Sequence, residues 1–324
     1  MQPFIVADIG GTNARFALIT DYDSDTVHIS TIQILQGKDY PSFSDALRAY
    51  ISCLDCSPSG ACVAIAGPIS GDRVSLTNLA WSFSQRELKA EFGFDTLLLM
   101  NDFAATAMAT SQVSSRDIVE IKAGDANPKG NKAIFGAGTG LGVAGLAYTG
   151  NSWLPIPSEG GHVNAPAATD YEGELVKAAR QRLGFVSAET FLCGPGLVNL
   201  YRAVAAVEGL EAKPYSPPDI TENALANSDD LCTQTLTHFC AMLGSHAGNL
   251  ALTYGATGGV YIAGGVIPRF VDFFKASPFV DRFENKGVMS HFVKPLPIYL
   301  FTGDNPAFMG AARWYLQSLE IGGR

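Results

Sequence analysis

The sequence contains little charge: Asp, Glu, Lys and Arg make up 16% of its 324 residues, whereas 47% are hydrophobic. Disordered chains have the opposite balance, so this composition predicts a globular protein with a large core. Basic residues are too few to balance the acidic ones, and the formal net charge is −9. Proteins that bind nucleic acids need basic surface against the phosphates, so we expect no nucleic-acid partner.

Apolar runs long enough to span a membrane are missing. Residues 133–158 and 241–268 contain no Asp, Glu, Lys or Arg, but glycines, polar residues and prolines interrupt both stretches. A spanning helix needs about 20 mostly apolar residues, so we expect buried strands and turns here. The first ten residues also lack the Lys or Arg of a secretory signal. We therefore expect a cytoplasmic protein with no membrane partner.

Cysteines are few, and three of the six lie close together in the sequence: Cys53, Cys56 and Cys62. No histidine is near this cluster, so a zinc site would need a fourth ligand from a distant part of the chain. Cys62 also begins the apolar stretch "CVAIAGP", which has the pattern of a buried strand. We therefore expect reduced, unpaired thiols rather than a metal or redox site.

A chain of 324 residues is too long for a single ordinary hydrophobic core, so we expect two domains. Three strands joined by tight turns come first, helix-linked strands follow, and the order begins again near residue 113. Aligning Gly11-Thr12 with Gly138-Thr139 superposes an apolar–turn–apolar pattern, which indicates two related sheets facing each other across a cleft. The expected strands are 3–9, 14–20, 26–34, 62–68, 96–102, 132–136, 141–148, 258–265 and 297–303, the expected helices are 42–54 (N-cap Ser42), 84–93 (C-cap Gly93), 170–184, 195–208, 229–252 and 305–319, and 213–219 is expected to be an exposed loop.

Two glycine-rich segments follow strands: "DIGGTN" at residues 8–13 and "GAGTGLG" at residues 136–142. Glycines allow positive φ and let backbone N–H groups approach a ligand without an intervening Cβ, so we interpret both segments as phosphate-binding loops. Asp8 repels phosphate but can hold a hydrated Mg²⁺ that bridges phosphate oxygens. Neither segment has the Gly-Lys-Ser/Thr of a P-loop or the helix of a dinucleotide-binding fingerprint, because both lead into strands. For the first segment alone, a plain hairpin with a surface Asp is the alternative.

Several polar residues sit at the ends of predicted elements. Asp102 follows Asn101 where a strand meets a helix, and it either caps that helix or acts as a general base toward an attacking hydroxyl. Glu159 and His162 flank two glycines, a pattern that suits hydrogen bonds to adjacent hydroxyls, whereas a metal site would need a third ligand. Glu189, which follows an expected apolar strand, alternatively serves as a first-turn helix carboxylate.

One further glycine pair, in "YIAGGVIPRF" (residues 261–270), lies between a predicted strand and a helix start near Pro268. Such a turn allows an aromatic base or a ribose to lie on the backbone, and a plain strand-to-helix turn is the alternative. Together, "ADIGGTNARFAL", "NDFAA", "GAGTGLGVA", "EGGHV", "SAE", "LCGPGLVNLYRA" and "IAGGVIPRF" resemble, in this order from residue 5 to 316, the bacterial glucokinases of the sugar-kinase/actin/heat-shock-chaperone ATPase superfamily.

The resemblance implies an α/β protein with the actin-like (ribonuclease H-like) ATPase fold, and ATP and glucose in the cleft between two α/β domains. It implies a small domain of residues 1–112 plus 303–324 and a large domain of residues 113–302, and it suggests a homodimer. The reaction implied is ATP-dependent phosphorylation of D-glucose at the 6-hydroxyl with Mg²⁺, the first step of glycolysis. The roles implied are a first phosphate motif of Asp8, Gly10, Gly11, Thr12 and Asn13, a second of Gly136, Gly138, Thr139 and Gly140, an adenosine motif of Gly264 and Gly265, Asp102 as the base, and Asn101, Glu159, His162 and Glu189 as ligands of the other hydroxyls.

Two departures from the family pattern are Gly67, where relatives often carry cysteine, and Asn164, where they usually carry aspartate. We expect neither to touch the sugar contacts, although Asn164 alters the support behind His162. The cysteine-rich zinc motif and the DNA-binding extension of the repressor-like relatives are absent, which favours the zinc-free group. The alternatives are a kinase for mannose, fructose or an N-acetylhexosamine, and a non-kinase actin-like ATPase, which would not need the hydroxyl-binding set.

Overall fold

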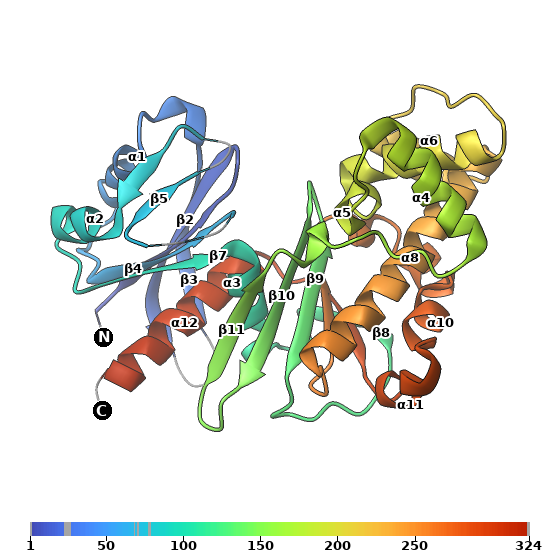
Figure 1. Ribbon diagram of the computed structural model, residues 1–324. Helices are drawn as coiled ribbons and strands as arrows, with labels where there is room; N and C mark the ends of the chain where they lie inside the picture. Colours follow the sequence, from blue (N-terminus) through green and yellow to red (C-terminus); the bar gives the residue numbers. More distant parts are fainter. Residues whose placement is uncertain (1, 23–26, 68, 70, 77–78, 323–324) are drawn as a thin grey trace. The chain divides into compact units, whose positions relative to one another are not determined.

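The computed structural model describes residues 2–22, 27–67, 69, 71–76 and 79–322 (Figure 1). The chain forms two compact mixed α/β units. The first unit contains residues 1–114, 151–157 and 303–324, and the second contains residues 115–150 and 158–302.

The first unit is built on a five-stranded sheet with the order β3-β2-β1-β4-β7. The pairs β1–β2 and β2–β3 are antiparallel, whereas β1–β4 and β4–β7 are parallel. This arrangement confirms the predicted change from antiparallel to helix-linked strands, because only parallel neighbours need a crossover connection. The strands are β1 (Phe4–Ile9), β2 (Asn13–Tyr22), β3 (Val27–Gln36), β4 (Gly60–Ile65) and β7 (Thr96–Asn101). Between β4 and β7 in the sequence, β5 (Arg73–Ser75) and β6 (Ser82–Ser84) form a separate two-stranded sheet.

Two helices connect these strands, and local capping signals set their ends. In α1 (Phe43–Ile51), the Ser42 hydroxyl accepts a hydrogen bond from the Asp45 N–H at 3.1 Å, as predicted. The helix ends at Ile51 rather than at 54, because the chain turns there. α2 (Gln85–Phe92) ends at Gly93, which has the left-handed conformation (φ 65°) that favours glycine.

The second unit is built on a six-stranded sheet with the order β11-β10-β9-β12-β13-β8. Its central strand β9 has antiparallel β10 on one side and parallel β12 and β13 on the other. The order β11-β10-β9-β12-β13 repeats β3-β2-β1-β4-β7, which confirms the predicted repeat, and β8 is an additional antiparallel strand. The strands are β8 (Ile118–Lys122), β9 (Lys132–Ala137), β10 (Leu141–Tyr148), β11 (Trp153–Ser158), β12 (Val260–Ala263) and β13 (Ile298–Phe301).

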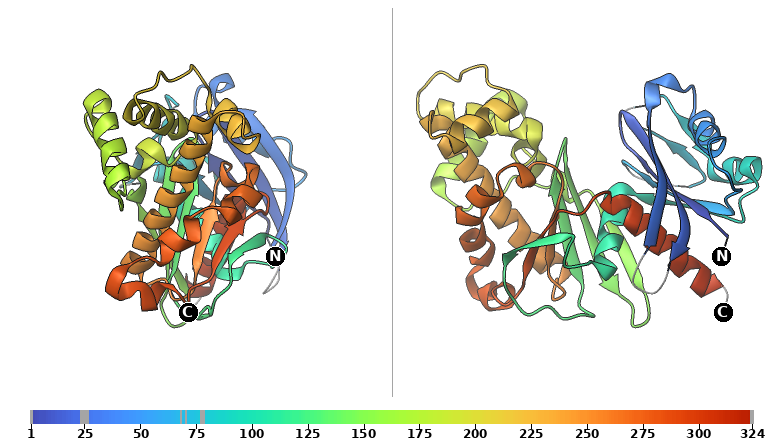
Figure 2. Two further views of the ribbon diagram at one scale, coloured as in Figure 1. Left: turned by 90° about the vertical axis from the view of Figure 1, so that its right-hand side faces the viewer. Right: turned by 180° about the vertical axis from the view of Figure 1, so that it is seen from behind.

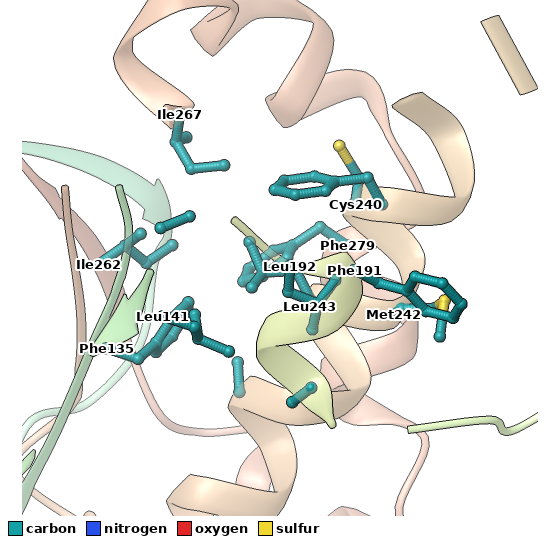
Figure 3. Close-up of a cluster of buried hydrophobic side chains, with 14 of the residues drawn as sticks. Phe135, Leu141, Phe191, Leu192, Cys240, Met242, Leu243, Ile262, Ile267 and Phe279 are labelled. Atoms are coloured by element: carbon teal, nitrogen blue, oxygen red, sulfur yellow. The ribbon is translucent and has the colours of Figure 1, made fainter. Parts of the chain in front are cut away.

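Helices supply the rest of the second unit's core, which packs against the sheet (Figure 3). Phe135 and Leu141 come from the sheet, and they meet Phe191, Leu192 and Leu243 in a buried cluster, in which each of these five side chains is at most 4% exposed. The helices are α4 (Asp170–Leu183), α5 (Ala188–Phe191), α6 (Gly194–Val207), α7 (Pro217–Leu225), α8 (Asp230–Tyr254), α9 (Val271–Ala276), α10 (Phe279–Glu284) and α11 (Ser290–Val293).

The last helix, α12 (Pro306–Gly322), belongs to the first unit and lies against α3 (Asp102–Ala109), as Figures 1 and 2 show. The Tyr315 ring stacks on that of Phe4 at 4.1 Å between centroids. Gly310 marks the closest approach, since a Cβ there would lie 1.6 Å from the carbonyl oxygen of Ala105. Only glycine therefore allows the two helices to cross at this distance.

Residues 151–157 were expected in the large domain, but they group with the first unit. The backbone N–H of Trp153 donates to Gln317 Oε1 at 2.9 Å, and Gln317 Nε2 donates back to the Trp153 carbonyl at 2.8 Å. This paired contact with α12 joins residues far apart in the sequence, so local patterns do not indicate it.

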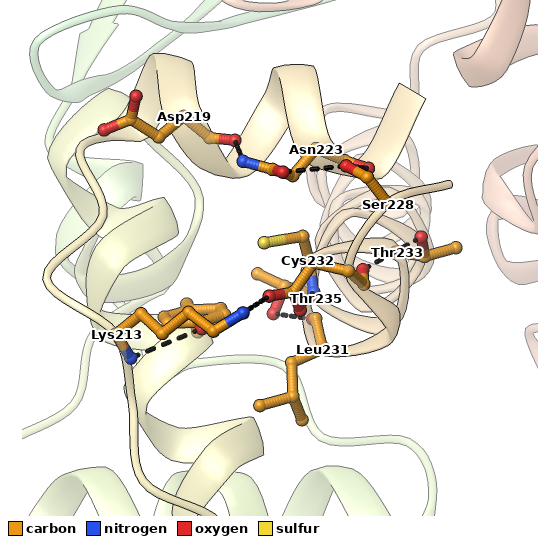
Figure 4. Close-up of polar contacts among 10 residues, drawn as sticks. Lys213, Asp219, Asn223, Ser228, Leu231, Cys232, Thr233 and Thr235 are labelled. Carbon is orange, nitrogen blue, oxygen red and sulfur yellow. Dashed lines mark hydrogen bonds and ion pairs between the residues drawn. The ribbon is translucent and has the colours of Figure 1, made fainter. Parts of the chain in front are cut away.

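The segment 213–219 was expected to be a loop, but helix α7 begins within it at Pro217. The Asp219 carboxylate accepts from the Ser216 N–H at 2.8 Å, which is half of a capping box, and proline is favoured in a first helical turn. Upstream, Lys213 Nζ lies 2.7 Å from Asp229 Oδ2, and Asp229 caps α8 by accepting from the Cys232 N–H (Figure 4). The segment is therefore anchored at both ends.

All six cysteines are free thiols, and Cys62 is buried in β4 as predicted, where burial raises the pKa of its thiol. Within the described ranges, no three His, Cys, Asp or Glu side chains come together as a metal-binding group. None of the helices in the described part of the chain is long and apolar enough to cross a membrane.

His246 of α8 makes the stability of the protein dependent on pH. Its side chain is 1% exposed, and its Nε2 has no hydrogen-bond partner among the described residues. Burial and the positive charge of Lys286 lower the pKa of this imidazole from 6.5 to about 4. Below pH 6.5 the unfolded chain therefore binds a proton that the folded chain does not.

As the pH is lowered from 6.5, the pKa of this group in the unfolded chain, to about 4, its pKa in the folded protein, we expect the free energy of unfolding to fall by about 1.4 kcal/mol per pH unit. Urea unfolding at about pH 7.5, 6 and 5 measures this fall in stability over most of the range. In His246→Gln this contribution is missing, so the variant should lose less stability on acidification than the wild type. Identical pH dependence in both proteins would contradict the assignment.

Candidate active site

In the first unit, Asp8 is the second-last residue of β1 and lies directly opposite Arg15 of β2. Arg15 Nη1 donates to Asp8 Oδ2 at 3.1 Å. Burial raises the pKa of the Asp8 carboxyl group, and the charge and hydrogen bond of Arg15 oppose this rise without cancelling it. A second cation beside the carboxylate would therefore be favourable, so the residue fits a Mg²⁺ role.

The loop after Asp8 is held by Gln36, the last residue of β3, and by Gly37 directly after it, a contact that the sequence does not predict. Gly37 N–H donates to the Thr12 carbonyl at 2.9 Å, and Gln36 Nε2 donates to Asn13 Oδ1 at 2.7 Å. Within the loop, Gly10 N–H donates to the Asn13 carbonyl at 3.0 Å. Thr12 is left exposed at the tip. The glycine at position 37 was the only local signal, and nothing in the spacing connects it to this loop.

Asn101 and Asp102 lie at the end of β7, the second strand along from β1 in the same sheet. Asn101 is the N-cap of α3, since its Oδ1 accepts from the N–H groups of Phe103 and Ala104, both at 3.0 Å. The alternative that Asp102 caps the helix is therefore wrong. Asp102 is the first residue of α3, and its Oδ1 accepts from the Phe103 N–H at 2.9 Å.

Gly67 was expected not to touch the sugar-binding residues, and this expectation is wrong. Asn101 Nδ2 donates to the Gly67 carbonyl at 3.3 Å. Gly67 also has φ 113°, a conformation that strains residues with a Cβ. The contact places a glycine-specific backbone turn behind Asn101.

In the second unit, the glycine turn of residues 138–140 joins β9 to β10. Gly138 N–H donates to the Gly140 carbonyl at 2.8 Å, and Gly194 N–H at the start of α6 donates to the Gly138 carbonyl at 2.8 Å. Thr139 is exposed at the tip, as Thr12 is in the first unit. Gly136 lies inside β9, paired with Gly142, and not in the turn itself.

Glycine allows positive φ, but in the described chain Gly10, Gly11, Gly138 and Gly140 do not adopt it. The reason at Gly140 is space, because a Cβ there would lie 2.5 Å from Glu189 Oε2.

Glu189 is in the first turn of α5, which Ser187 caps through a capping box with Thr190. It follows α4 and a turn, so the strand expected before it is wrong. Its Oε2 accepts from the Leu141 N–H at 2.7 Å, and its Oε1 lies 4.0 Å from His162 Nε2. The carboxylate therefore reaches from its helix to the glycine turn.

Glu159 and His162 border the short 3₁₀ turn Gly160–His162, in which His162 N–H donates to the Glu159 carbonyl at 2.9 Å. A Cβ on Gly161 would lie 2.0 Å from the Leu141 carbonyl oxygen, so the glycine lets this turn press against β10. Both polar side chains are exposed. The structure thus brings His162 and Glu189 together beside the glycine turn, with Glu159 at the start of the same segment.

Gly264 and Gly265 follow β12, and both are exposed. Gly264 has φ 86°, and a Cβ there would lie 2.4 Å from the Ala137 carbonyl oxygen. Val266 N–H donates to that same carbonyl at 3.1 Å. The predicted strand–turn–helix arrangement is confirmed, and it places this turn against the end of β9, next to the 138–140 turn.

Two sheets of repeated order, each with a glycine turn after its central strand, define the actin-like ATPase fold with two α/β domains. Solved structures agree. The fold matches "glucokinase from Antarctic psychrotroph" with a TM-score of 0.92 and 43% identity, covering 98% of this chain and 99% of the other. A glucokinase from Balamuthia mandrillaris in complex with glucose matches in fold, with a TM-score of 0.75 and 22% identity over 97% and 93% of the two chains.

Sequence comparison is more specific. The family model described as Glucokinase matches residues 5–318. A glucokinase from Saccharophagus degradans is 59% identical over 97% of this chain and 98% of its own length, and one from Pectobacterium atrosepticum is 43% identical over 97% of each. The chain therefore belongs to the glucokinase family.

Proposed function

We propose that this protein is an ATP-dependent kinase that phosphorylates D-glucose at its 6-hydroxyl, giving glucose 6-phosphate and ADP. The observation that carries the proposal is the Glu189 carboxylate, which lies on the glycine turn and beside His162 in a chain of the glucokinase family. The proposal therefore assigns hydroxyl binding and phosphate binding to neighbouring groups of one unit, as a sugar kinase requires.

Asp102 is the residue we assign as general base. Asn101 is the N-cap of α3, and Asp102 follows it as the first residue of that helix, directly after β7. Asp102 accepts the proton of the 6-hydroxyl as the oxygen attacks the γ-phosphorus. Phosphoryl transfer otherwise asks little covalent chemistry of the protein, and positioning dominates the rate.

The other sugar hydroxyls are assigned to Asn101, Glu159, His162 and Glu189. Glu189 and Glu159 supply acceptors, whereas the His162 ring and the Asn101 amide supply donors as well. A site built to hydrogen-bond a hydroxyl rejects an analogue that lacks it by about 10⁴-fold, because the polar groups of the site are then left unpaired. The choice of glucose over mannose, fructose or N-acetylhexosamines is supported by the glucokinase family match.

The nucleotide is assigned to the glycine turns: Gly10, Gly11, Thr12 and Asn13 in the first unit, and Gly138, Thr139 and Gly140, with Gly136 behind them, in the second. Gly264 and Gly265 provide an open backbone surface for the adenosine. Asp8 is assigned to Mg²⁺, which when bound neutralises charge on the phosphates during transfer. We also propose a cytoplasmic homodimer without nucleic-acid or membrane partners, since six free thiols suit a reducing compartment.

The test is ADP release from Mg²⁺-ATP with glucose, mannose, fructose or N-acetylglucosamine, beside a control without sugar. We expect strong release with glucose and little with the other sugars. Release that is independent of sugar would identify an ATPase and overturn the proposal. Preference for another hexose would retain the kinase and correct its substrate.

A further inference from the structure

Glu189 uses its two carboxylate oxygens in different directions. Oε2 accepts the Leu141 N–H at 2.7 Å, directly after the 138–140 turn. Oε1 lies on the side of His162, at 4.0 Å from Nε2. The oxygen that faces the sugar-binding histidine is therefore oriented by a contact that the other oxygen makes with the phosphate-binding turn.

Gly140 makes this orientation sterically possible. A Cβ at position 140 would lie 2.5 Å from Glu189 Oε2 and 3.3 Å from Cδ. Gly138, two residues away in the same turn, has no heavy atom within 4 Å of the corresponding position. The two glycines thus differ in their relation to Glu189, although they share one turn.

A second connection runs through Cys193, the N-cap of α6. Its Sγ donates to the Glu189 carbonyl at 3.1 Å and accepts from the Gly196 N–H at 3.3 Å. The next residue, Gly194, donates its N–H to the Gly138 carbonyl at 2.8 Å. Burial raises the pKa of the Cys193 thiol to about 11, so it stays protonated and able to donate.

Hydrophobic packing fixes the two segments that the Glu189–Leu141 hydrogen bond joins. Leu141 lies in the buried cluster of the second unit together with Phe191 and Leu192, which follow Glu189 in the chain (Figure 3). Their side chains are at most 4% exposed. The backbone on either side of the Glu189–Leu141 contact is therefore fixed, and the carboxylate has little freedom to move without losing that contact.

We infer that Gly140 and Cys193 are positioning residues for sugar binding: they hold Glu189 against the phosphate-binding turn so that Oε1 meets a glucose hydroxyl. The inference rests on the proposed function. Its consequence is that a small change on the nucleotide side of the site weakens glucose binding even when no nucleotide is present.

Calorimetric titration of the nucleotide-free full-length protein with glucose tests this. Gly140→Ala is expected to weaken glucose binding by about ten- to a hundredfold, the effect of losing one hydrogen bond to a charged group. Gly173→Ala is the matched control, and its glucose affinity should stay within about twofold of the wild type, because Gly173 is an exposed residue of α4 outside the proposed site and a Cβ there meets no heavy atom within 4 Å. Equal affinity of Gly140→Ala and wild type would overturn the inference. Failure of the wild type to bind glucose would instead contradict the proposed function.

A second pair of variants covers the case in which Gly140→Ala does not fold, which a thermal melt reveals. Cys193→Ala removes both thiol hydrogen bonds, whereas Cys193→Ser keeps a donor and an acceptor at the N-cap. We expect a severalfold weaker glucose affinity in the alanine variant and recovery in the serine variant, at similar melting temperatures. Wild-type affinity in Cys193→Ala, or a loss that serine does not restore, would overturn the inference.

Discussion

Replacing Asp102 with asparagine is expected to lower kcat by about 10²- to 10⁴-fold, because the amide cannot take the proton of the attacking hydroxyl. Glucose affinity should change little. The fold should also tolerate the substitution, since Asn101 makes the capping bonds of α3 and an amide oxygen can still accept from the Phe103 N–H. Steady-state kinetics and a glucose titration measure the two effects separately.

Asp230 offers a matched control, because it is the first residue of α8 just as Asp102 is the first residue of α3. It is exposed and has no role in the proposed site. Asp230→Asn should therefore keep wild-type kcat. A folded Asp102→Asn protein with wild-type turnover would remove Asp102 from the mechanism, and a parallel loss of glucose binding would indicate a structural role.

Gly310→Ala is expected to cost about 3 kcal/mol or more of unfolding free energy, at or above the upper end for overpacked cores. The added methyl group would lie 1.6 Å from the carbonyl oxygen of Ala105, and backbone at that distance cannot give way as a side chain can. The helices α3 and α12 must therefore separate. Urea unfolding of the two proteins at one pH measures the difference.

Gly173→Ala, the same substitution at another helical position, is expected to raise the stability of the protein instead. Gly173 is an exposed position within α4, and a Cβ there meets no heavy atom within 4 Å. Alanine should stabilise this helix by about 0.5–1 kcal/mol, because glycine is the poorer helix former. If both substitutions changed stability by the same small amount, the close crossing of α3 and α12 at Gly310 would be incorrect.

The elements set by local chemistry are the ones that the sequence predicts well. Ser42 and Gly93 sit at helix ends because capping needs only a few neighbouring residues. The strands before both glycine turns likewise follow from short apolar runs, and their repeat gave the two-sheet fold. Helix α7 was missed although Ser216 and Asp219 form a capping box, because three prolines within residues 213–219 gave the segment the composition of a loop.

The site was predictable in its residue types but not in its contacts. Glycine is required at position 140 by a carboxylate 49 positions later, and at position 310 by a carbonyl oxygen of another helix. Neither reason leaves a mark in the neighbouring sequence. Nothing in the neighbouring sequence singles out Cys193 as a cap, whereas the structure gives it a helix-capping role normally filled by serine or aspartate.

The return of α12 to the first unit has a consequence for biosynthesis. Translation at about 5–20 residues per second takes roughly 10–40 s to pass from the end of α3 at Ala109 to the start of α12 at Pro306. Throughout that interval the nascent chain exposes the surfaces of α3 and Phe4 that α12 later covers. The second unit completes its sequence first, so the part of the protein that leaves the ribosome earliest is the part that matures last.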